Sequence, residues 1–436
     1  FMNISILTVF SQIYDSFLQT SLIKRAQEAG TVSFDIQEFF SFCEPKERID
    51  SPTFGHGAGM VIKPEVVQKA VEKQETKHGK AFKIFLSPQG KKLDQTLAKK
   101  LSQKFLETKH VMLISSRYEG MDSRVEEYYA DESVSVGDVV LMGGDVPTMM
   151  LLETVLRYVP GVVGKQESVE YESFSGPFVD YPQYAAPVEW NGIKVPDIVR
   201  SGDHGKVSEW REAKAAEKTV KGHFEWLRSH LMTDEQKSLA ASFIPSHYVV
   251  LMHDEILLEK GRVGTTSVAS LDIHDIARSS RTYGLKKYFI VTPLEDQQKI
   301  IQKLLSFWDS DVGKTYNRGR HDAVSRVCIE PSLQDVLKRI EEEEGKNPVI
   351  ISTSAQESDL SNPINYYDQE KVWSLDRPVL FVLGTGRGLS EKVIKKSDFV
   401  LLPINGFSNF NHLSVRSAAA IIFDRWFGIS TKGEHS

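Results

Sequence analysis

The sequence predicts an α/β protein with two parallel-sheet domains separated by a small helical domain. Residues 2–164 alternate short apolar runs with longer amphipathic runs, which is typical of βα units on a parallel sheet. The same alternation starts afresh at His247, after a helical stretch over about residues 208–241. At roughly 150 residues per domain, a chain of 436 residues has room for about three domains.

Composition limits the class of protein. With 41% hydrophobic and 26% charged residues, the chain has the mix of a soluble globular protein. Two cysteines, Cys43 and Cys328, are too few for a disulfide framework and stand in no zinc-binding spacing, so we expect a reducing, cytoplasmic setting and no metal site. No apolar run is long enough for a membrane span, and the N-terminal residues lack the pattern of a secretion signal. The net charge of −6 argues against bulk electrostatic binding of nucleic acid, so any polyanion site must be local.

Strands and helices alternate in the first domain, residues 2–164. The expected strands are 4–10, 32–38, 83–86, 111–115 and 139–142, and the expected helices are 14–28, 94–108 and 148–158. Residues 87–90 and 117–120 are expected to be loops, and Gly143 and Gly144 end the last strand. Pro147 then stands in the first turn of the last helix, a position that favours proline.

The middle of the chain differs in composition. Residues 165–184 have no apolar period and are expected to form an exposed interdomain linker. Residues 185–244 form the expected helical domain, and Pro245 marks its end.

The second parallel-sheet domain is expected over residues 245–430. Its strands are 248–251, 287–291, 324–329, 348–352, 379–383 and 399–402, and its helices are 273–282, 294–308, 333–343 and 413–427. In each half a strand ends in a glycine-bearing loop, the next strand ends in a second loop, and a helix follows. We infer two copies of one α/β architecture, although few residues are identical between them.

Loops at the carboxyl ends of parallel strands form the ligand crevice of open α/β sheets, and their glycines let the backbone approach a small molecule. Two such loops in each half predict one ligand per half. Residues 55–59 (GHGAG) lack the preceding strand and the ribose-binding acid of a dinucleotide site, and no P-loop, HExxH or GxSxG is present. The His-Asp pairs that begin at residues 253, 274 and 321 stand among alternating strands and helices, whereas metal phosphohydrolase chemistry needs a helical cage.

Six segments of the first half carry a resemblance to a known family. They are DSPTFGHGAGM (50–60), LSPQGKKLDQ (86–95), RYEGMDSR (117–124), SVGDVVLMGGDVP (135–147), RYVPGVVG (157–164) and SGDH (201–204). In order and spacing they resemble the bacterial tRNA (guanine-N1)-methyltransferase family called TrmD, over roughly residues 2–240. The resemblance implies a trefoil-knotted SPOUT fold, a homodimer, S-adenosylmethionine as methyl donor and guanosine 37 of tRNA, beside the anticodon, as acceptor.

The second half is similar to another SPOUT-type methyltransferase domain, of a kind classed as a predicted S-adenosylmethionine-dependent RNA methyltransferase. The supporting segments are LGTG (383–386) with Gly388 and Leu389, LPING (402–406) and LSVRSA (413–418). This resemblance implies one polypeptide with two knotted domains.

The resemblance also implies a set of cofactor-binding residues at the strand-end loops. In the first half they are Leu86, Ser87, Pro88, Gln89, Ser116, Tyr118, Glu119, Gly120, Ser135, Val136, Gly137, Asp138, Val139, Val140, Leu141, Gly143, Gly144 and Pro147. In the second half they are Gly384, Gly386, Pro403, Ile404, Asn405 and Leu413.

Methylation of guanine N1 requires removal of the N1 proton and stabilisation of the charge that spreads to O6. By resemblance, Arg157 lies beside O6, and Glu172 occupies the position of the general base, which is Asp in the family. A glutamate is one methylene longer, so its carboxylate must fold back to reach the same point. Asp180, which matches a second acid of the family, is the other catalytic candidate, and Glu170 is a further fallback.

For the tRNA, His204 and Arg211 are the favoured contacts because they lie in or next to the SGDH segment. Further candidates for phosphate contacts are Lys91, Lys92, Arg200, Lys206 and Lys214.

The main hypothesis is therefore an enzyme that methylates tRNA. An alternative is a knotted RNA-binding or dimerisation protein with reduced or no turnover, which is favoured by Glu172 in place of Asp and by Ser116 in place of a glycine of the family. A dehydrogenase-like nucleotide enzyme is a third hypothesis.

Overall fold

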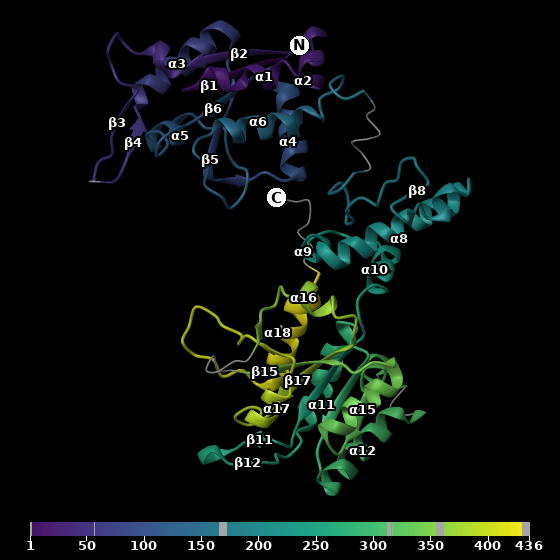
Figure 1. Cartoon of the computed structure of the whole chain (residues 1–436). Coiled ribbons are helices and arrows are strands. Elements are labelled where there is room, and N and C mark those ends of the chain that lie inside the picture. Colours follow the sequence, from purple (N-terminus) through teal and green to yellow (C-terminus); the bar gives the residue numbers. More distant parts are fainter. Residues whose placement is uncertain are drawn as a thin grey trace. The chain divides into compact units, whose positions relative to one another are not determined.

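The computed structural model describes residues 2–55, 57–164, 172–311, 315, 317–354 and 362–429. The chain divides into two compact units, Phe1–Ser175 and Gly176–Ser436, here called unit 1 and unit 2 (Figure 1). Each unit contains a parallel β-sheet with helices on both faces. The predicted α/β class with parallel sheets is confirmed.

The described part of unit 1 contains a five-stranded parallel sheet in the order β2-β1-β6-β5-β7. Its strands are β1 (Met2–Thr8), β2 (Val32–Glu38), β5 (Phe82–Lys92), β6 (His110–Ser115) and β7 (Glu132–Ser135). Successive side chains of a strand point to opposite faces, so Ile4 and Ile6 enter one hydrophobic core while Leu7 and Val9 enter the other.

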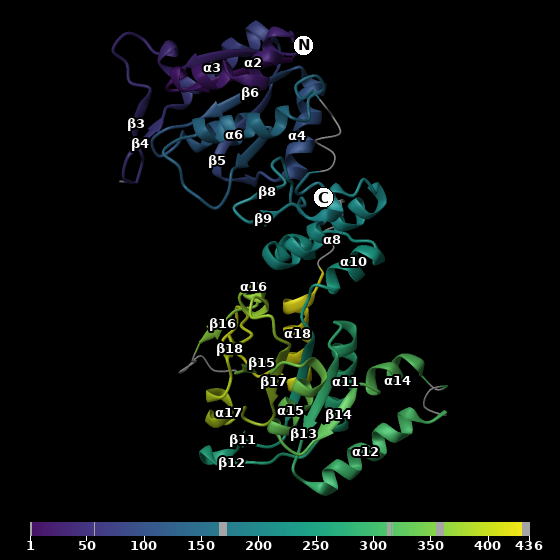
Figure 2. The ribbon, with the colours of Figure 1, turned by 45° about the vertical axis from the view of Figure 1, so that its right-hand side comes forward.

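Helices cover both faces of this sheet (Figure 2). One face carries α1 (Asp15–Leu18), α2 (Ser21–Glu28), α4 (Gln95–Thr108) and α6 (Asp145–Leu156), and the other carries α3 (Pro64–His78) and α5 (Ser123–Tyr129). Shorter elements are η1 (Ser11–Tyr14), η2 (Phe39–Phe42) and the antiparallel pair β3 (Asp50–Pro52) and β4 (Met60–Ile62). Local sequence sets the helix starts: the Asp94 carboxylate accepts a hydrogen bond from the Leu97 N–H at 2.8 Å, and Pro64 opens α3.

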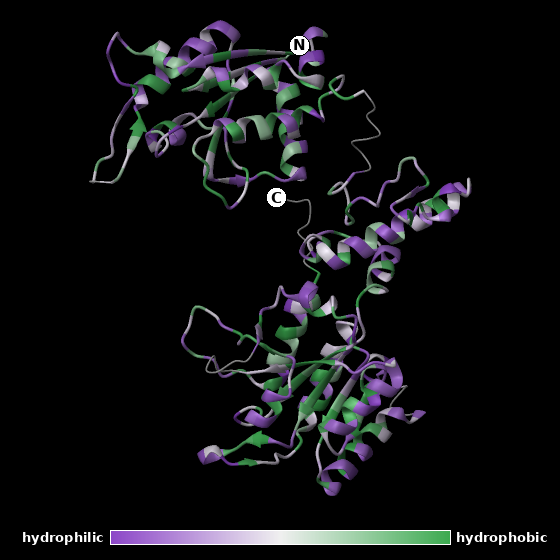
Figure 3. Ribbon diagram, viewed as in Figure 1, coloured by the Kyte–Doolittle hydropathy of each residue, from purple (hydrophilic) through white to green (hydrophobic). Residues whose placement is uncertain are grey.

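In unit 2 the described residues form a seven-stranded parallel sheet in the order β14-β13-β10-β17-β15-β18-β16. Its strands are β10 (His247–Met252), β13 (Lys287–Val291), β14 (Val327–Glu330), β15 (Val349–Thr353), β16 (Pro363–Ile364), β17 (Val379–Gly384) and β18 (Phe399–Leu401). A short hairpin of β11 (Ile256–Leu257) and β12 (Val263–Gly264), joined through η4 (Glu259–Gly261), follows β10. The central strands are strongly hydrophobic in Figure 3, whereas the outer surfaces of the helices are largely hydrophilic.

Two helical layers enclose this sheet. One face carries α11 (Ser270–Thr282), α12 (Glu295–Asp309), α14 (Arg318–Val324), α16 (Gln369–Trp373) and α18 (Val415–Phe427), and the other carries α15 (Leu333–Glu344) and α17 (Glu391–Lys395). Successive side chains of β10 point to alternate layers. Val249 and Leu251 pack against the first layer, and Tyr248 and Val250 pack against the second.

The helical stretch before β10 also belongs to unit 2. It comprises β8 (Glu189–Trp190), β9 (Ile193–Lys194), η3 (Asp197–Arg200), α8 (His204–Gly222), α9 (Phe224–Arg228) and α10 (Asp234–Ala241). Leu227 and Ala240 lie in the same hydrophobic core as the seven-stranded sheet. Arg228 donates hydrogen bonds to the carbonyl oxygens of Gly428 at 2.7 Å, Arg425 at 2.6 Å and Asp424 at 2.9 Å. These contacts join the stretch to the C-terminal end of α18.

The two sheets repeat one topology. Across the sheet of unit 1 the strands follow the order β2-β1-β6-β5-β7, and the corresponding strands of unit 2 follow the order β13-β10-β17-β15-β18. If the five strands of each set are numbered along the chain, both orders read 2-1-4-3-5. The loops agree as well: Gly120 and Gly388 both have a φ of +109°, and two residues later Asp122 and Ser390 each cap the next helix. The predicted repetition of one architecture is confirmed.

The expected strand at residues 139–142 is wrong. This apolar run is a surface loop, with exposed fractions of 56% for Val139, 86% for Val140, 45% for Leu141 and 91% for Met142. The strand that precedes α6 is β7, which pairs with β5 and completes the sheet at that edge. An apolar run indicates that burial would be favourable, but in unit 1 β7 forms the edge strand before α6 and the run lies outside the sheet.

Other boundaries also differ. Residues 87–90 do not form a free loop, because β5 runs through them and its pairing with β7 is irregular between Leu86 and Lys91. The expected helix at 14–28 is divided in two, and Ser21 at the division has a φ of +46°. The expected strand at 324–329 begins only at Val327. The last helix begins at Val415, since the Ser414 hydroxyl accepts the N–H hydrogen bond that caps it.

Candidate active site

The candidate site of unit 1 lies at the carboxyl edge of its parallel sheet. Two segments far apart in sequence meet there: the loop after β6, which starts at Ser116, and the pair Gly143-Gly144 before α6. The Gly144 N–H donates to the Ser116 carbonyl at 2.8 Å, and Arg117 and Gly143 form an antiparallel bridge. The predicted loops therefore lie side by side.

The glycines at this edge are needed for packing between these segments. A Cβ at Gly143 would lie 2.4 Å from the Arg117 Cδ, and a Cβ at Gly144 would lie 3.0 Å from the Ser115 Cα. At Gly90 a Cβ would lie 2.5 Å from the Ser133 carbonyl carbon. We expected such glycines to let the backbone approach a small molecule. In the structure they instead let two segments of the chain approach each other closely.

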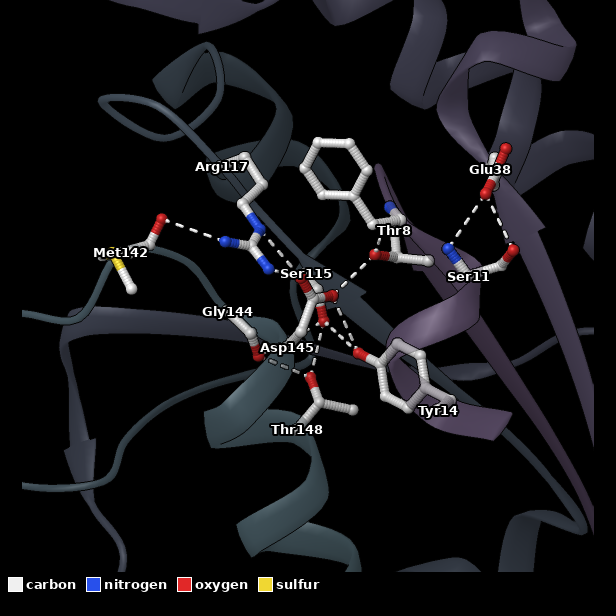
Figure 4. A network of polar contacts seen from close by, with 11 residues as sticks. Thr8, Ser11, Tyr14, Glu38, Ser115, Arg117, Met142, Gly144, Asp145 and Thr148 are labelled. Carbon is white, nitrogen blue, oxygen red and sulfur yellow. Dashed lines mark hydrogen bonds and ion pairs between the residues drawn. The ribbon is translucent and has the colours of Figure 1, made fainter. Parts of the chain in front are cut away.

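A buried carboxylate, Asp145, fastens the two segments together (Figure 4). It is fully buried, and its Oδ2 accepts a hydrogen bond from the Arg117 Nε at 2.9 Å and lies 2.7 Å from the Arg117 Nη2. Its Oδ1 accepts from the Thr8 hydroxyl at 2.6 Å and the Tyr14 hydroxyl at 2.9 Å. Both oxygens are thus satisfied, as a buried charge requires.

Ser115 and Thr148 extend the network under the glycines. The Ser115 hydroxyl lies 2.6 Å from the Thr148 hydroxyl, which donates to the Gly144 carbonyl at 2.9 Å. Burial and the neighbouring Asp145 charge raise the pKa of Tyr14 well above its ordinary value, so this hydroxyl stays a donor. Arg117 also lies over the Phe10 ring, 5.3 Å from its centroid. The network ties the ends of β1 and β6 to the start of α6.

The sequence contained these residues but did not show that they pair. Arg117 lies in RYEG and Asp145 in GGDVP, two segments already singled out, and neither was named as a site residue. The sequence showed only that an aspartate follows two glycines and that an arginine stands in the other loop. Nothing local distinguishes such a pair from two solvated charges.

The predicted cofactor residues of unit 1 differ in exposure. Leu86, Ser135, Gly144 and Pro147 are buried; Ser87, Ser116, Gly120, Val136, Gly137 and Gly143 are half-buried; and Pro88, Gln89, Tyr118, Glu119, Asp138 and residues 139–142 are exposed. The backbone N–H groups of residues 139–142 form no hydrogen bond with the described residues. Tyr118 has a φ of +61°, an uncommon backbone conformation for a residue with a side chain. This surface offers a small molecule exposed backbone donors beside apolar side chains.

The structure brings together two of the three catalytic candidates. The Glu172 carboxylate accepts hydrogen bonds from Arg157, from Gln95 at 2.8 Å and from the Tyr158 hydroxyl at 3.4 Å. Burial and the Glu172 charge raise the pKa of Tyr158 to about 12. Gln95 and Tyr158 each belong to a quoted segment, yet they were not predicted as partners of Glu172.

Of the other two acid candidates, the structure describes Asp180. Asp180 belongs to unit 2, where its Oδ1 accepts a hydrogen bond from the Tyr181 N–H at 2.9 Å. Glu170 lies outside the described residues.

The candidate tRNA contacts lie on exposed surface. His204 is the first residue of α8, and the Arg211 guanidinium lies over the Tyr181 ring at 4.7 Å. The other candidates pair with acids: Lys91 with Glu132, Lys92 with Asp138, Arg200 with Asp197, Lys206 with Asp203 and Lys214 with Glu217.

In unit 2 the glycine loop after β17 packs against the segment after β10. A Cβ at Gly384 would lie 2.8 Å from the Leu389 nitrogen, and Gly386, with a φ of +58°, lies against Ile256. The remaining candidates follow β18: Pro403 is buried, Ile404 is half-buried, and Asn405 and Leu413 are exposed. The glycine loop of unit 2 is therefore packed as closely as that of unit 1, but against the segment after β10.

A hydrogen-bond chain behind this loop fixes the tautomer of His253, which is 1% exposed. The Thr385 hydroxyl donates to the Met252 carbonyl at 3.0 Å, so it can only accept from Thr266 at 2.6 Å. The Thr266 oxygen, 3.0 Å from the His253 Nδ1, then accepts from that nitrogen. His253 is therefore protonated on Nδ1, and its buried Nε2 has no partner among the described residues. Burial lowers the pKa of His253 to about 4.

The described residues contain no group of three or more His, Cys, Asp or Glu side chains that could hold a metal ion. A search of the same residues finds no helix with the length and apolar character needed to cross a membrane.

Comparison with known proteins agrees with this geometry. A family model for “tRNA (Guanine-1)-methyltransferase TrmD” matches residues 2–229, and one for “SAM-dependent RNA methyltransferase” matches residues 246–428. Proteins of Nitratidesulfovibrio vulgaris and Oleidesulfovibrio alaskensis, both named tRNA (guanine-N(1)-)-methyltransferase, are each 34% identical over 433 residues, which is 98% of this chain and 99% of theirs. A protein of Geobacillus kaustophilus with the same name is 38% identical over 237 residues, 54% of this chain and 96% of its own length.

The name tRNA (guanine-N(1)-)-methyltransferase thus applies both to a protein that aligns with 98% of the chain and to one that aligns with its first half. The loops, the repeated parallel sheets and the two family matches agree, and the resemblance seen in the sequence is confirmed. The chain belongs to the tRNA (guanine-N1)-methyltransferase family and carries a SAM-dependent RNA methyltransferase domain in its second half.

Proposed function

We propose that unit 1 transfers the methyl group of S-adenosylmethionine to N1 of guanosine 37 in tRNA. By family the chain is an S-adenosylmethionine-dependent tRNA (guanine-N1)-methyltransferase. One observation carries the proposal: Glu172 and Arg157, the predicted base and O6 partner, lie in direct contact. A carboxylate and a guanidinium held together provide both groups that N1 methylation requires.

We assign the N1 proton to the Glu172 carboxylate and the developing O6 charge to Arg157. The side chain of Arg157 is 39% exposed and that of Glu172 is 18% exposed, so a nucleobase can reach both from solvent. A guanidinium carries five N–H donors in a plane, so Arg157 can keep its contact with Glu172 while other donors face O6.

Gln95 and Tyr158 act as positioning residues in this proposal. Both donate to the Glu172 Oε1 and restrict the longer glutamate side chain to one place. Positioning matters because a displacement of about 1 Å at a reacting group can reduce the rate on the order of a hundredfold. Asp180 remains the alternative base.

S-adenosylmethionine supplies the methyl group on a sulfonium centre. We propose that the loop after β6 and residues 135–141 hold it. Support comes from the unpaired backbone N–H groups of residues 139–142, which can bind polar edges of the ligand, and from the apolar side chains around them. The ion pair between Arg117 and Asp145 holds the loop after β6 against the start of α6.

We further propose that the chain has trefoil-knotted SPOUT domains and acts as a cytoplasmic homodimer. The support for a dimer is a set of exposed apolar side chains, in which residues 139–142 are followed on α6 by Val146 and Met150, exposed to 53% and 47%. Apolar patches of this kind commonly mark protein interfaces. Both cysteines are free, as a reducing compartment would keep them.

The proposed domain order is a SPOUT domain at 2–164, a linker at 165–184, a tRNA-binding helical domain at 185–244 and a second SPOUT domain at 245–430. In the helical domain we propose His204 and Arg211 as tRNA contacts. The second domain binds its own S-adenosylmethionine at the loops that contain Gly384, Gly386 and residues 403–405, and it methylates another RNA position.

The test uses the full chain with tritiated S-adenosylmethionine and an unmodified tRNA transcript that has guanosine at position 37. The matched control is the same transcript with adenosine at that position. We expect labelled 1-methylguanosine from the first transcript and none from the second. Equal labelling of both would contradict guanosine 37 as acceptor. No label from a protein that binds S-adenosylmethionine would indicate a binding or dimerisation protein instead.

A further inference from the structure

Unit 2 contains an arginine-lined cavity that none of the sites above includes. Its volume is about 270 Å³, and its lining includes Arg278, Arg281, Asn317 and Arg320. Arg278 and Arg281 lie on the last turns of α11, and Arg320 lies on α14, which packs beside α11 (Figure 2).

The acids of this region leave the cavity with an excess of positive charge. Asp272 and Asp275, on the first turns of α11, pair with Arg416 at 3.2 Å and 3.6 Å, and neither lines the cavity. Asp322 pairs with Arg281, whose Nε donates to it at 2.7 Å. Neither Arg278 nor Arg320 forms an ion pair with a described acid. Two of the three lining charges are therefore available to an anion.

The available guanidinium groups differ in how firmly they are held. Arg320 lies over the Trp308 ring, 5.2 Å from its centroid, and Trp308 is only 6% exposed. Stacking on a buried indole restricts the orientation of the guanidinium. Arg278 is exposed, and its guanidinium has no hydrogen bond, ion pair or ring contact with the described residues. One donor is preorganised, and the other is free to close on a ligand.

The two available arginines also act on the neighbouring His274. Burial lowers its pKa first, and the charges of Arg320 and Arg278 lower it further, although Asp275 opposes them. A cationic imidazole is thus disfavoured beside the cavity, as expected where positive charge accumulates.

We propose that this cavity binds a phosphate group of the RNA strand on which unit 2 acts. The planar N–H pairs of arginine match phosphate oxygens, and a cavity of this size accommodates one phosphate. Arg278 stands eight residues beyond Ser270, roughly 12 Å along the helix from the end near the carboxyl edge of the sheet. That separation suits a nucleotide flanking the methylated one. The inference rests on the proposed function, which makes RNA the ligand of unit 2.

The test measures binding of a fluorescein-labelled uridine dodecamer RNA to the full chain by anisotropy at several KCl concentrations. The variant is Arg278→Gln, and the matched control is Lys338→Gln on α15, at the other face of the sheet. We expect Arg278→Gln to weaken binding roughly fivefold to tenfold. It also reduces the slope of log K against log salt by about 0.7, the loss of one phosphate contact. Lys338→Gln leaves both values unchanged.

Two outcomes overturn the inference. One is an unchanged affinity and salt slope in both Arg278→Gln and Arg320→Gln, with circular dichroism showing that the variants are folded. The other is inorganic phosphate binding that Arg278→Gln abolishes while the RNA affinity stays that of the wild type, which would make the cavity a site for free anions. Failure of the proposed function of unit 2 is distinct, since the wild-type chain with tritiated S-adenosylmethionine then labels RNA at no position other than the guanosine methylated by unit 1, whatever the RNA affinities are.

Discussion

Arg117 holds the buried Asp145 through two nitrogens, Nε at 2.9 Å and Nη2 at 2.7 Å from the same carboxylate oxygen. The two residues are 28 positions apart and belong to the two loops that form the carboxyl edge of unit 1. The proposed surface for the methyl donor therefore depends on this ion pair, which holds its two loops together. In unit 2 the equivalent loop is held by hydroxyl groups instead, through Thr266 and Thr385.

Replacement of Asp145 by alanine is expected to destabilise unit 1 by about 3 kcal/mol or more, because Arg117, Thr8 and Tyr14 lose their common buried acceptor. All six tryptophans lie in unit 2, so urea unfolding followed by tryptophan fluorescence reports that unit alone, while circular dichroism reports both. The dichroism transition should move to lower urea and the fluorescence transition should stay. Asp138→Ala, at a carboxylate that is 92% exposed, is the control and should change stability by less than about 0.5 kcal/mol. A loss of equal size in both variants would refute a special role for Asp145.

The exchange of Glu172 for glutamine should lower methyl transfer to tRNA at least on the order of a hundredfold, which is the usual contribution of a general base. Glu172→Asp should retain activity, because it restores the family residue. Asp180→Asn should keep most of its turnover. Single-turnover rates at saturating S-adenosylmethionine measure the effect, and calorimetry checks that the cofactor still binds. If Asp180→Asn lost turnover and Glu172→Gln kept it, the base would be Asp180.

His253 should remain neutral and protonated on Nδ1 from pH 5 to pH 8, given its pKa of about 4 in the folded chain. Nitrogen chemical shifts of histidine in the labelled protein measure this directly. The sign of the pH effect follows from linkage: the folded-state pKa is below the ordinary value, so the unfolded chain takes up the proton first. Stability of unit 2 is then unaffected above about pH 6.5 and falls as the pH decreases from 6.5 towards 4. His253→Gln should reduce this dependence but not abolish it, because burial also lowers the pKa of His247 in the same unit, to about 3. An Nε2-protonated His253 ring would contradict the hydrogen-bond chain.

Arg228→Met should destabilise unit 2 by about 1–3 kcal/mol, because three carbonyl oxygens at the end of α18 lose a charged donor while the aliphatic packing is kept. Tryptophan fluorescence during urea unfolding measures the change. Lys237→Met on α10 removes an equally charged but solvent-facing group, and its stability should match the wild type. A shift of the same size in the control would show that net charge, rather than the contact with α18, is responsible.

Much of the fold was predictable because its signals are local. The strands at 32–38 and 287–291 agree with β2 and β13 residue for residue, since the first alternates apolar and polar residues and the second is a short apolar run. The equivalence of the loops at Gly120 and Gly388 followed from the order of strand, loop and helix in each half. The family residues Arg157 and Glu172 were also found from the sequence, and the structure places them in contact.

The errors have a common cause. Residues 139–142 have the apolar composition of a buried strand, yet they are exposed because β7 occupies the edge of the sheet. Gln95 joins Glu172 across 77 positions, and no local pattern marks such a contact. Likewise, no local pattern marks the contacts by which Arg228 and Leu227, within the predicted helical domain at 185–244, join the end of α18 and the core of unit 2.

The sequence by itself determined the repeated alternation of strands and helices, the glycine-bearing loops and the family, because periodicity, turn chemistry and motif order are written along the chain. The tertiary structure decided which charges are paired and which apolar residues are covered. Asp145 is a site residue because Thr8, Tyr14 and Arg117 all bind its carboxylate. Arg278 is a candidate for binding phosphate because none of the described acids pairs with its guanidinium. Pairing and burial depend on distances between segments far apart in the chain, and only folding sets those distances.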